Sequence, residues 1–238
     1  MAKEAITFTE PAKAGKFTFV GQFARCMYLP GEPYLLLLTD GTRIYFEKGF
    51  EPPKGWEMWD RLRVRGQVKA ADFEEGGDWD KWQFAAVSQV ERLRRPEKTA
   101  DLKASEDVLL IGLAKQVKGQ WQLQGLFPGA PSIDLSDAFA AKFEGEFKPK
   151  KGGAVMMVGN VARKNENKWQ LTDVAGTFIF PQPRNLGELK GRIAEECYIP
   201  GKLVEENVSA KSRESGTIPY WFLKMKTGDL LYVYDDSG

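Results

Sequence analysis

RGQVKA (Arg65–Ala70) and KWQFAAV (Lys81–Val87) return later in the chain as VGNVAR (Val158–Arg163) and KWQLTDV (Lys168–Val174). In each copy a glycine and alternating apolar residues come before a turn, and Lys-Trp-Gln opens the segment after it. Apolar side chains at every second position are typical of a strand with one buried face. The sequence therefore predicts one β-hairpin written twice, with the longer turn in the first copy.

The residues before the first copy also have the pattern of strands. Lys16–Leu29 is rich in aromatic and β-branched residues, and Tyr34–Gly49 holds two apolar runs around Asp40-Gly41. Asp-Gly between apolar runs is the strongest short-range signal for a hairpin. Glu51–Asp60 contains two adjacent prolines, which a strand does not accept, so we expect an irregular or helical link there. The first module therefore has five strands, with this link between the third and the fourth.

The second copy lies in the same plan. Asp107–Gly119 and Gln120–Phe127 predict another hairpin, and Pro131–Ser136 is a candidate for a short third strand. Asp137–Phe147 predicts a helix, because phenylalanine recurs there at every fourth position and forms one apolar stripe. The repeated hairpin then supplies the fourth and fifth strands of the second module.

The C-terminal part repeats only the first half of this plan. Pro219–Tyr234 can be aligned with Pro33–Phe46, but nothing after it matches the repeated hairpin. A partial sheet has a bare edge, which proteins usually cover. Three arrangements would cover it: packing on the second module, addition of the strand Ala5–Thr9, or pairing through residues 202–234 with another chain, either in a homodimer or with a protein partner.

Five strands with a link or helix between the third and fourth resemble the OB-fold, a small Greek-key barrel. We therefore expect an all-β fold with short helices, made of tandem OB-fold five-stranded Greek-key barrels, two complete and a partial third. The expected modules are residues 1–97, 104–183 and 184–238. Tandem OB modules are similar to the single-stranded nucleic-acid-binding proteins of the replication protein A type. The chain differs from such families in having neither a zinc ribbon nor a long acidic tail that ends in phenylalanine.

The resemblance implies non-catalytic binding of single-stranded nucleic acid, DNA more than RNA, by base stacking and phosphate contacts. Arg61, Arg63 and Arg65 share one face of a predicted strand, and Lys69 lies further along it. Alternate side chains on a strand are about 6.6–7 Å apart, which is near the phosphate spacing of an extended nucleic-acid strand. These residues are therefore candidate phosphate contacts. The alternative is that the arginines only solvate the outer face of a barrel.

The candidates for base stacking lie in turns, in the link and beside the first hairpins: Trp56, Trp59, Trp79, Tyr34 and Trp121. Trp82 and Trp169 open strands that should fill the barrels, so core packing is the expected role of these two side chains. Arg94 and Arg95 are interpreted as part of a linker between modules.

The composition limits the classes of function. The chain has 34 Lys and Arg against 33 Asp and Glu, so any nucleic-acid surface must be a local patch. It has no histidine and only two cysteines, which removes the commonest general base and the usual zinc sites. Phosphate-loop and dinucleotide-binding motifs are absent as well. We therefore expect no enzyme activity, no metal and no cofactor. The acidic residues 72–80 form a solvated hairpin turn or, as the alternative, a cation site.

No apolar run is long enough for a membrane span, and the first residues have no signal core, so a cytoplasmic protein without membrane contact is expected. The alternative function is that of an assembly module, in which OB barrels dock a partner protein and never contact nucleic acid. The nearly neutral charge and the incomplete third module favour this alternative.

Overall fold

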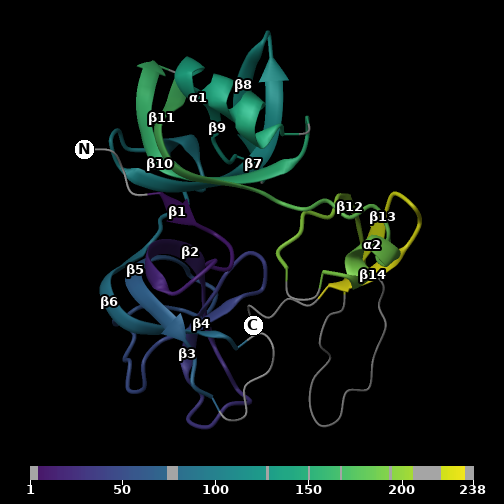
Figure 1. The fold of residues 1–238 in the computed structure, drawn as a ribbon. Coiled ribbons are helices and arrows are strands. Elements are labelled where there is room, and N and C mark those ends of the chain that lie inside the picture. Colours follow the sequence, from purple (N-terminus) through teal and green to yellow (C-terminus); the bar gives the residue numbers. More distant parts are fainter. Residues whose placement is uncertain are drawn as a thin grey trace. The chain divides into compact units, whose positions relative to one another are not determined.

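The computed structural model describes residues 5–73, 80–126, 129–149, 151–166, 168–192, 195–205 and 221–233. The chain divides into two compact units, Met1–Phe180 with Ala194–Glu196, and Pro181–Ile193 with Cys197–Gly238. Strands dominate the described residues and the helices are short, which confirms the predicted all-β fold class (Figure 1).

The first barrel is a ring of five strands that closes on itself. Its order is β2-β3-β4-β6-β5, and a further pairing of β2 with β5 joins the two ends. The pair β4–β6 is parallel and the others are antiparallel, which is the Greek-key order expected for an OB-fold. The strands are β2 (Gly15–Arg25), β3 (Tyr34–Leu37), β4 (Arg43–Tyr45), β5 (Arg61–Ala70) and β6 (Trp82–Arg92).

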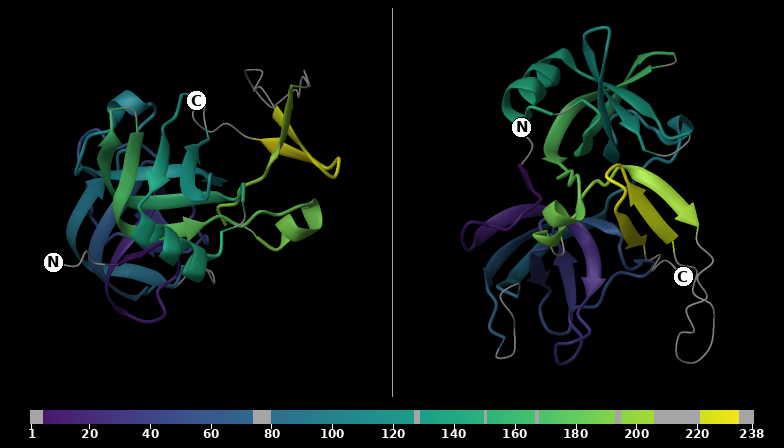
Figure 2. Two further views of the ribbon diagram at one scale, coloured as in Figure 1. Left: turned by 90° about the horizontal axis from the view of Figure 1, so that it is seen from above. Right: turned by 90° about the vertical axis from the view of Figure 1, so that its right-hand side faces the viewer.

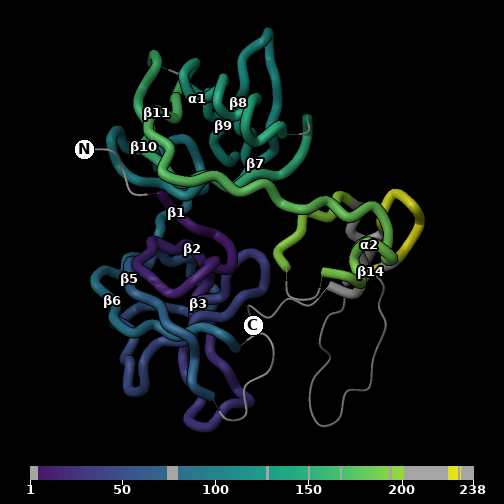
Figure 3. Tube along the Cα trace, in the orientation of Figure 1, coloured from purple at the N-terminus to yellow at the C-terminus, as the bar shows by residue number. Residues whose placement is uncertain are grey.

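The second barrel repeats this order. It is closed as β10-β11-β9-β8-β7, with the parallel pair β9–β11 in the place of β4–β6. A 3₁₀ turn, Thr99–Asp101, lies in the linker between the barrels, and the chain can be followed through both in Figure 3. The elements are β7 (Asp107–Val117), β8 (Gln120–Gly125), β9 (Ser132–Leu135), α1 (Asp137–Lys142), a π-helical turn (Phe143–Phe147), β10 (Ala154–Asn165) and β11 (Lys168–Ile179).

Both copies of the repeated pattern form the predicted hairpin in the same register. Gly66 in β5 lies opposite Val87 in β6, and Gly159 in β10 lies opposite Val174 in β11. In both hairpins the register shifts directly before the glycine and again between the first and second residues that follow it. A Cβ at Gly66 would lie 2.7 Å from the carbonyl oxygen of Ala86, so the strands approach more closely than any side chain allows. The glycine of the repeated pattern is thus a requirement of the β-bulge.

Each barrel encloses its own apolar core. Leu62 and Val64 are fully buried inside the first barrel, which places the alternating arginines of β5 on its outer side. In the second barrel, Phe143 packs edge-on against Trp121, with ring centroids 5.5 Å apart. The helix α1 begins after Ser136, whose Oγ accepts a hydrogen bond from the Phe139 N–H.

The N-terminal strand does not complete the third sheet. β1 (Ile6–Thr7) pairs in parallel with β2, with Ile6 beside Thr18, and belongs to the first unit. The arrangement in which Ala5–Thr9 joins the C-terminal sheet is therefore wrong. β1 is only two residues long, and both of its residues pair with β2.

The second unit contains a three-stranded antiparallel sheet in the order β12-β13-β14, shown in Figure 2. The strands are β12 (Gly201–Glu205), β13 (Trp221–Met225) and β14 (Leu230–Val233), preceded by the short helix α2 (Leu186–Lys190). Gly228 turns the hairpin between β13 and β14 with φ +94°, as Gly41 does in the first barrel with φ +85°. Tyr220 and Tyr234, predicted for this sheet, lie outside the described residues. None of the helices in the described part of the chain has the length and apolar character needed to cross a bilayer.

Candidate nucleic-acid interface

A groove of about 540 Å³ runs along the first unit where the link before β5, the end of β6, the linker and β7 meet. We call it the arginine groove. The lining residues on which its chemistry depends are Trp59, Arg61, Arg92, Arg94, Arg95 and Leu109. The groove thus brings together Trp59 and Arg61, which were predicted as site residues from the sequence. It also contains three arginines that were not predicted as site residues: Arg92, Arg94 and Arg95.

Trp59 is the unusual residue of this groove. The residue is 48% exposed, and its backbone has φ +72°, a conformation that a bulky residue rarely adopts. Two backbone hydrogen bonds hold it: the Trp59 N–H donates to the Phe23 carbonyl, and the Phe23 N–H donates to the Asp60 carbonyl, both at 2.8 Å. Backbone strain of this kind costs on the order of 1–3 kcal/mol and persists where the surroundings enforce it, often at functional sites.

The arginines around Trp59 differ in how open they are. The Arg92 side chain is 51% exposed although its guanidinium contacts Asp60 at 2.9 Å. Arg95 is exposed, whereas Arg94 is half-buried and pairs with Glu106 at 2.9 Å. A guanidinium carries five N–H donors, so one carboxylate partner leaves Arg92 able to contact a phosphate as well.

The arginine row predicted on β5 faces outward as expected, but two of its three members are engaged by carboxylates. Arg61 is 9% exposed and donates two hydrogen bonds of 2.7 Å to the two oxygens of Glu196. Arg63 contacts Asp107 at 2.7 Å and also pairs with Glu91. The row therefore does not present three open charges, since bidentate carboxylate pairing uses the same donors that a phosphate would. Arg65 and Lys69 are exposed and lie outside the arginine groove.

Most of the aromatic candidates are packed in the cores. Trp121 is 5% exposed and belongs to the second core, because alternation along β8 turns it inward together with Leu123. Tyr34 stacks on Phe23 with ring centroids 5.1 Å apart, and Trp56 packs edge-on against the same phenylalanine. The expectation that Trp121 stacks on bases is therefore not supported by its position. Trp79, with the acidic residues 74–79 around it, lies outside the described residues.

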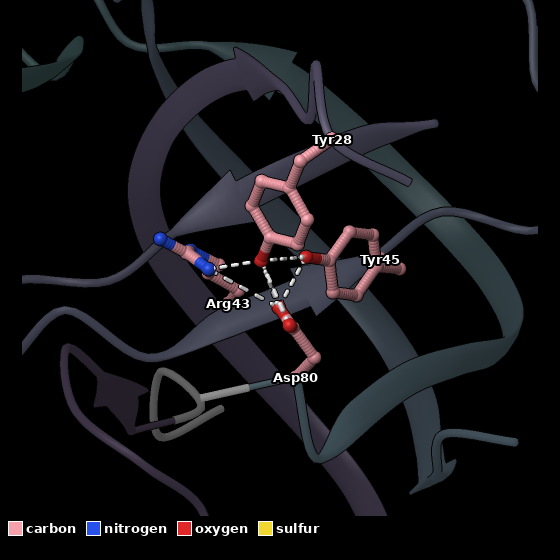
Figure 4. Close-up of polar contacts among 4 residues, drawn as sticks. All are labelled: Tyr28, Arg43, Tyr45 and Asp80. Carbon is pink, nitrogen blue, oxygen red and sulfur yellow. Dashed lines mark hydrogen bonds and ion pairs between the residues drawn. The ribbon is translucent and has the colours of Figure 1, made fainter. Parts of the chain in front are cut away.

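A polar cluster in the first barrel was not found from the sequence (Figure 4). Asp80 is buried and accepts hydrogen bonds from the hydroxyls of Tyr28, at 2.7–2.8 Å, and of Tyr45. Arg43 contacts Asp80 at 3.3 Å and also reaches the Tyr28 hydroxyl. Tyr28 as a whole residue is 55% exposed, and the Arg43 guanidinium lies 5.3 Å from the centroid of its ring.

The environment of this cluster keeps both phenols protonated. Burial and the hydrogen bonds to Asp80 and Cys26 raise the pKa of the Tyr28 hydroxyl to about 12, although the contacts with Tyr45 and Arg43 lower it. Burial and the hydrogen bond to Asp80 also raise the pKa of Tyr45. A phenolate beside the buried carboxylate would be repelled, so the neutral phenols remain as donors. The cluster therefore ties the loop that carries Tyr28 to β4 and to Asp80, two residues before β6 begins.

This loop covers the outer face of the strands β3 and β4. Cys26 and Leu29 from the loop form an apolar cluster with Leu35 and Tyr45, against which Phe73 also packs. In OB-folds this face of the second and third strands commonly binds the ligand. In the first barrel this face is occupied by the chain itself.

No protein-family model matches the chain, and no curated protein matches it. Among solved structures it is similar to the single-stranded DNA binding protein from Thermus aquaticus, as a deletion mutant (12% identity, 68% of this chain and 93% of that chain, TM-score 0.21) and as the wild type (12%, 72% and 84%, TM-score 0.20). The tetrameric p202 HIN2 structure is 12% identical and covers 73% of this chain and 97% of that chain, with a TM-score of 0.24. With TM-scores this low, the OB-fold assignment depends on the strand order and not on these likenesses. In the part of the chain that the structure describes, no three acidic or cysteine side chains are grouped to hold a metal ion.

Proposed function

We propose that this protein binds single-stranded nucleic acid without catalysis, and DNA in preference to RNA, in the arginine groove. The observation that carries the proposal is Trp59: an exposed tryptophan, held in a strained backbone, in a groove lined by four arginines. Stacking of one base on the indole stabilises a complex by roughly 1–3 kcal/mol and tolerates any base. The preference for DNA over RNA follows from the resemblance of the tandem OB modules to single-strand binders of the replication protein A type.

The phosphate contacts of this proposal come from Arg92 and Arg95, the two exposed arginines of the groove. Arg61 supports the site indirectly, because its pair with Glu196 fixes the start of β5 directly after Trp59 and Asp60. Each phosphate that is neutralised on a single strand contributes about 0.7 to the slope of log affinity against log salt.

The test is the salt dependence of binding to a fluorescein-labelled dT12 oligonucleotide, measured by fluorescence anisotropy. We expect the parent to bind at low salt, and the double variant R92Q/R95Q to bind more weakly with a slope that is smaller by about 1.4. Glutamine is chosen because it can still donate a hydrogen bond to Asp60, which would otherwise be left without its arginine. The matched control is R65Q, an exposed arginine of β5 outside the groove, which should leave the slope unchanged.

Two results would contradict the proposal in different ways. If the parent does not bind the oligonucleotide even at low salt, the function is wrong. If R65Q reduces the slope and R92Q/R95Q does not, nucleic acid is bound along the outer face of β5 and the groove is not the site.

The sheet of the second unit favours a second candidate function, docking of a protein partner. Within the described residues β12 and β14 each pair only with β13, so both outer strands have an edge open to strand addition. Light scattering coupled to size-exclusion chromatography tests the homodimeric form of this idea through residues 202–234. A concentration-independent monomer would exclude self-association.

A further inference from the structure

A second, smaller cavity of about 240 Å³ adjoins the arginine groove. The two cavities share four lining residues, Arg95, Glu97, Leu109 and Ile111. Beyond these shared residues the wall is mostly apolar and comes from the second barrel: Leu123, Ala130, Pro131 and Ile133. We call it the apolar cavity. The linker forms a wall of both the cavity and the groove.

The apolar cavity exists because β8 covers only part of β7. The two strands pair from Gly112 opposite Gly125 to Val117 opposite Gln120, so β8 does not reach Leu109. The linker takes its place there, with the Leu109 N–H donating to the Arg94 carbonyl at 2.9 Å. Between the linker and the departing β8 the barrel wall is open, and the core side chains of the second barrel line the gap.

We propose that the apolar cavity takes one unstacked base of the strand whose phosphates lie in the arginine groove. This inference rests on the proposed function. The cavity is smaller than the roughly 300–1,000 Å³ of pockets for larger ligands, which suits a single flat ring. Its apolar walls bury the faces of the ring. Arg95 and Glu97, on the shared wall, provide a donor and an acceptor for the polar edge of the base.

The neighbouring charge favours a base over other apolar groups of similar size. A leucine or phenylalanine of a peptide would fit the same walls, but it would gain nothing from the arginines beside them. A nucleotide carries a flat ring and an anionic phosphate on the same residue, and this matches an apolar cavity that opens onto Arg95. Because a single strand has no base pairs to break, extrusion of one base costs only lost stacking.

The experiment combines a cavity-filling variant with abasic oligonucleotides of the shortest length that the parent binds. Ala130→Leu places a larger side chain in the cavity and leaves the groove arginines unchanged. We expect it to weaken binding about 10-fold, within the range for loss of one base contact, with the salt slope of the parent. The matched control is Ala86→Leu, the same change at an exposed position of β6, which should bind like the parent.

An abasic residue placed at each position in turn then locates the bound bases on the parent protein itself. We expect an abasic residue to weaken binding at two positions of the oligonucleotide. At one of them it should no longer weaken binding to a Trp59→Ala variant, and at the other it should no longer weaken binding to Ala130→Leu, because the contact of that base is already absent from the variant. If Ala130→Leu does not fold, the scan on the parent still decides. Fewer than two sensitive positions, or an Ala130→Leu protein that binds like the parent, would overturn the inference while the proposed function stands. Absence of any oligonucleotide binding by the parent would overturn both.

Discussion

Replacing Trp59 by alanine and, separately, by glycine tests both properties of this residue, its exposed ring and its strained backbone. Both variants lose the same indole, so any loss of side-chain contacts is equal in the two proteins. They differ in how well the new residue accepts φ +72° and in how much backbone entropy it loses on folding. Glycine adopts positive φ about as readily as negative φ, whereas an alanine there costs about 1 kcal/mol.

The two readouts have defined magnitudes. We expect the Trp59→Gly protein to unfold with a free energy up to about 0.6 kcal/mol higher than that of Trp59→Ala, because the strain of alanine, about 1 kcal/mol, exceeds the roughly 0.4–1 kcal/mol of extra backbone entropy that glycine loses. At an ordinary negative φ the order would be the reverse, since glycine loses roughly 0.4–1 kcal/mol more backbone entropy on folding. Both variants should bind the dT12 oligonucleotide about 5- to 150-fold more weakly than the parent, which is the loss of one stacked base.

Urea unfolding followed by circular dichroism measures the first quantity, and fluorescence anisotropy the second. A Trp59→Gly protein less stable than Trp59→Ala would show that the backbone at this residue is not strained. Unchanged affinity in both variants would show that the indole does not contact the nucleic acid, whatever its conformation.

Two further predictions concern the scaffold. Gly66→Ala should lower the free energy of unfolding by about 1–3 kcal/mol, because the new Cβ would lie 2.7 Å from the carbonyl oxygen of Ala86. The control Gly145→Ala should not lower it, since a Cβ there has nothing within 4 Å. Equal effects of the two substitutions in urea unfolding would contradict the close approach of the strands. Burial and the hydrogen bond to Asp80 raise the pKa of Tyr28 from 10.0 to about 12, so the stability given by the neutral phenol is complete below pH 10 and is lost as the pH rises towards 12. Unfolding measured across this range should show a steeper fall for the parent than for Tyr28→Phe, and identical curves would contradict the role of this hydroxyl.

The repeated hairpins could be predicted from the sequence because strand alternation is a local property. The spacing of valines and of Lys-Trp-Gln defines the buried face and the register, and both copies have the same bulges at Gly66 and Gly159. Strand partners far apart in sequence were harder to predict. Ile6–Thr7 has no local feature that favours β2 over another edge, so its place in the first barrel required the three-dimensional structure.

The candidate site was predicted in part. Alternation correctly placed the β5 arginines on the outer face, but the carboxylates that engage Arg61 and Arg63 come from distant segments, Glu196 and Asp107. Such ion pairs leave no trace in the local pattern. The composition of the link indicated both Trp56 and Trp59 as candidates; Trp59 lines the groove, whereas Trp56 packs against Phe23.

Part of the groove was overlooked because its residues have an ordinary local explanation. From the sequence, Arg94 and Arg95 are interpreted as part of a linker, and they do lie in the linker between the barrels. Only the packing of this linker beside β7 shows that a connecting segment is also the shared wall of the two cavities.

Closure of each barrel has a consequence for the order of folding events. The hairpins β5–β6 and β10–β11 join neighbouring segments, whereas closure of the first barrel brings together residues as distant in sequence as Gly15 and Val68. Local contacts form before long-range ones because they lose less chain entropy. The duplicated hairpins are therefore the natural nuclei, and the seams β2–β5 and β7–β10 are the slow steps. Until its seam forms, each nascent barrel exposes two unpaired edges, and a chain with two such barrels passes through this aggregation-prone stage twice.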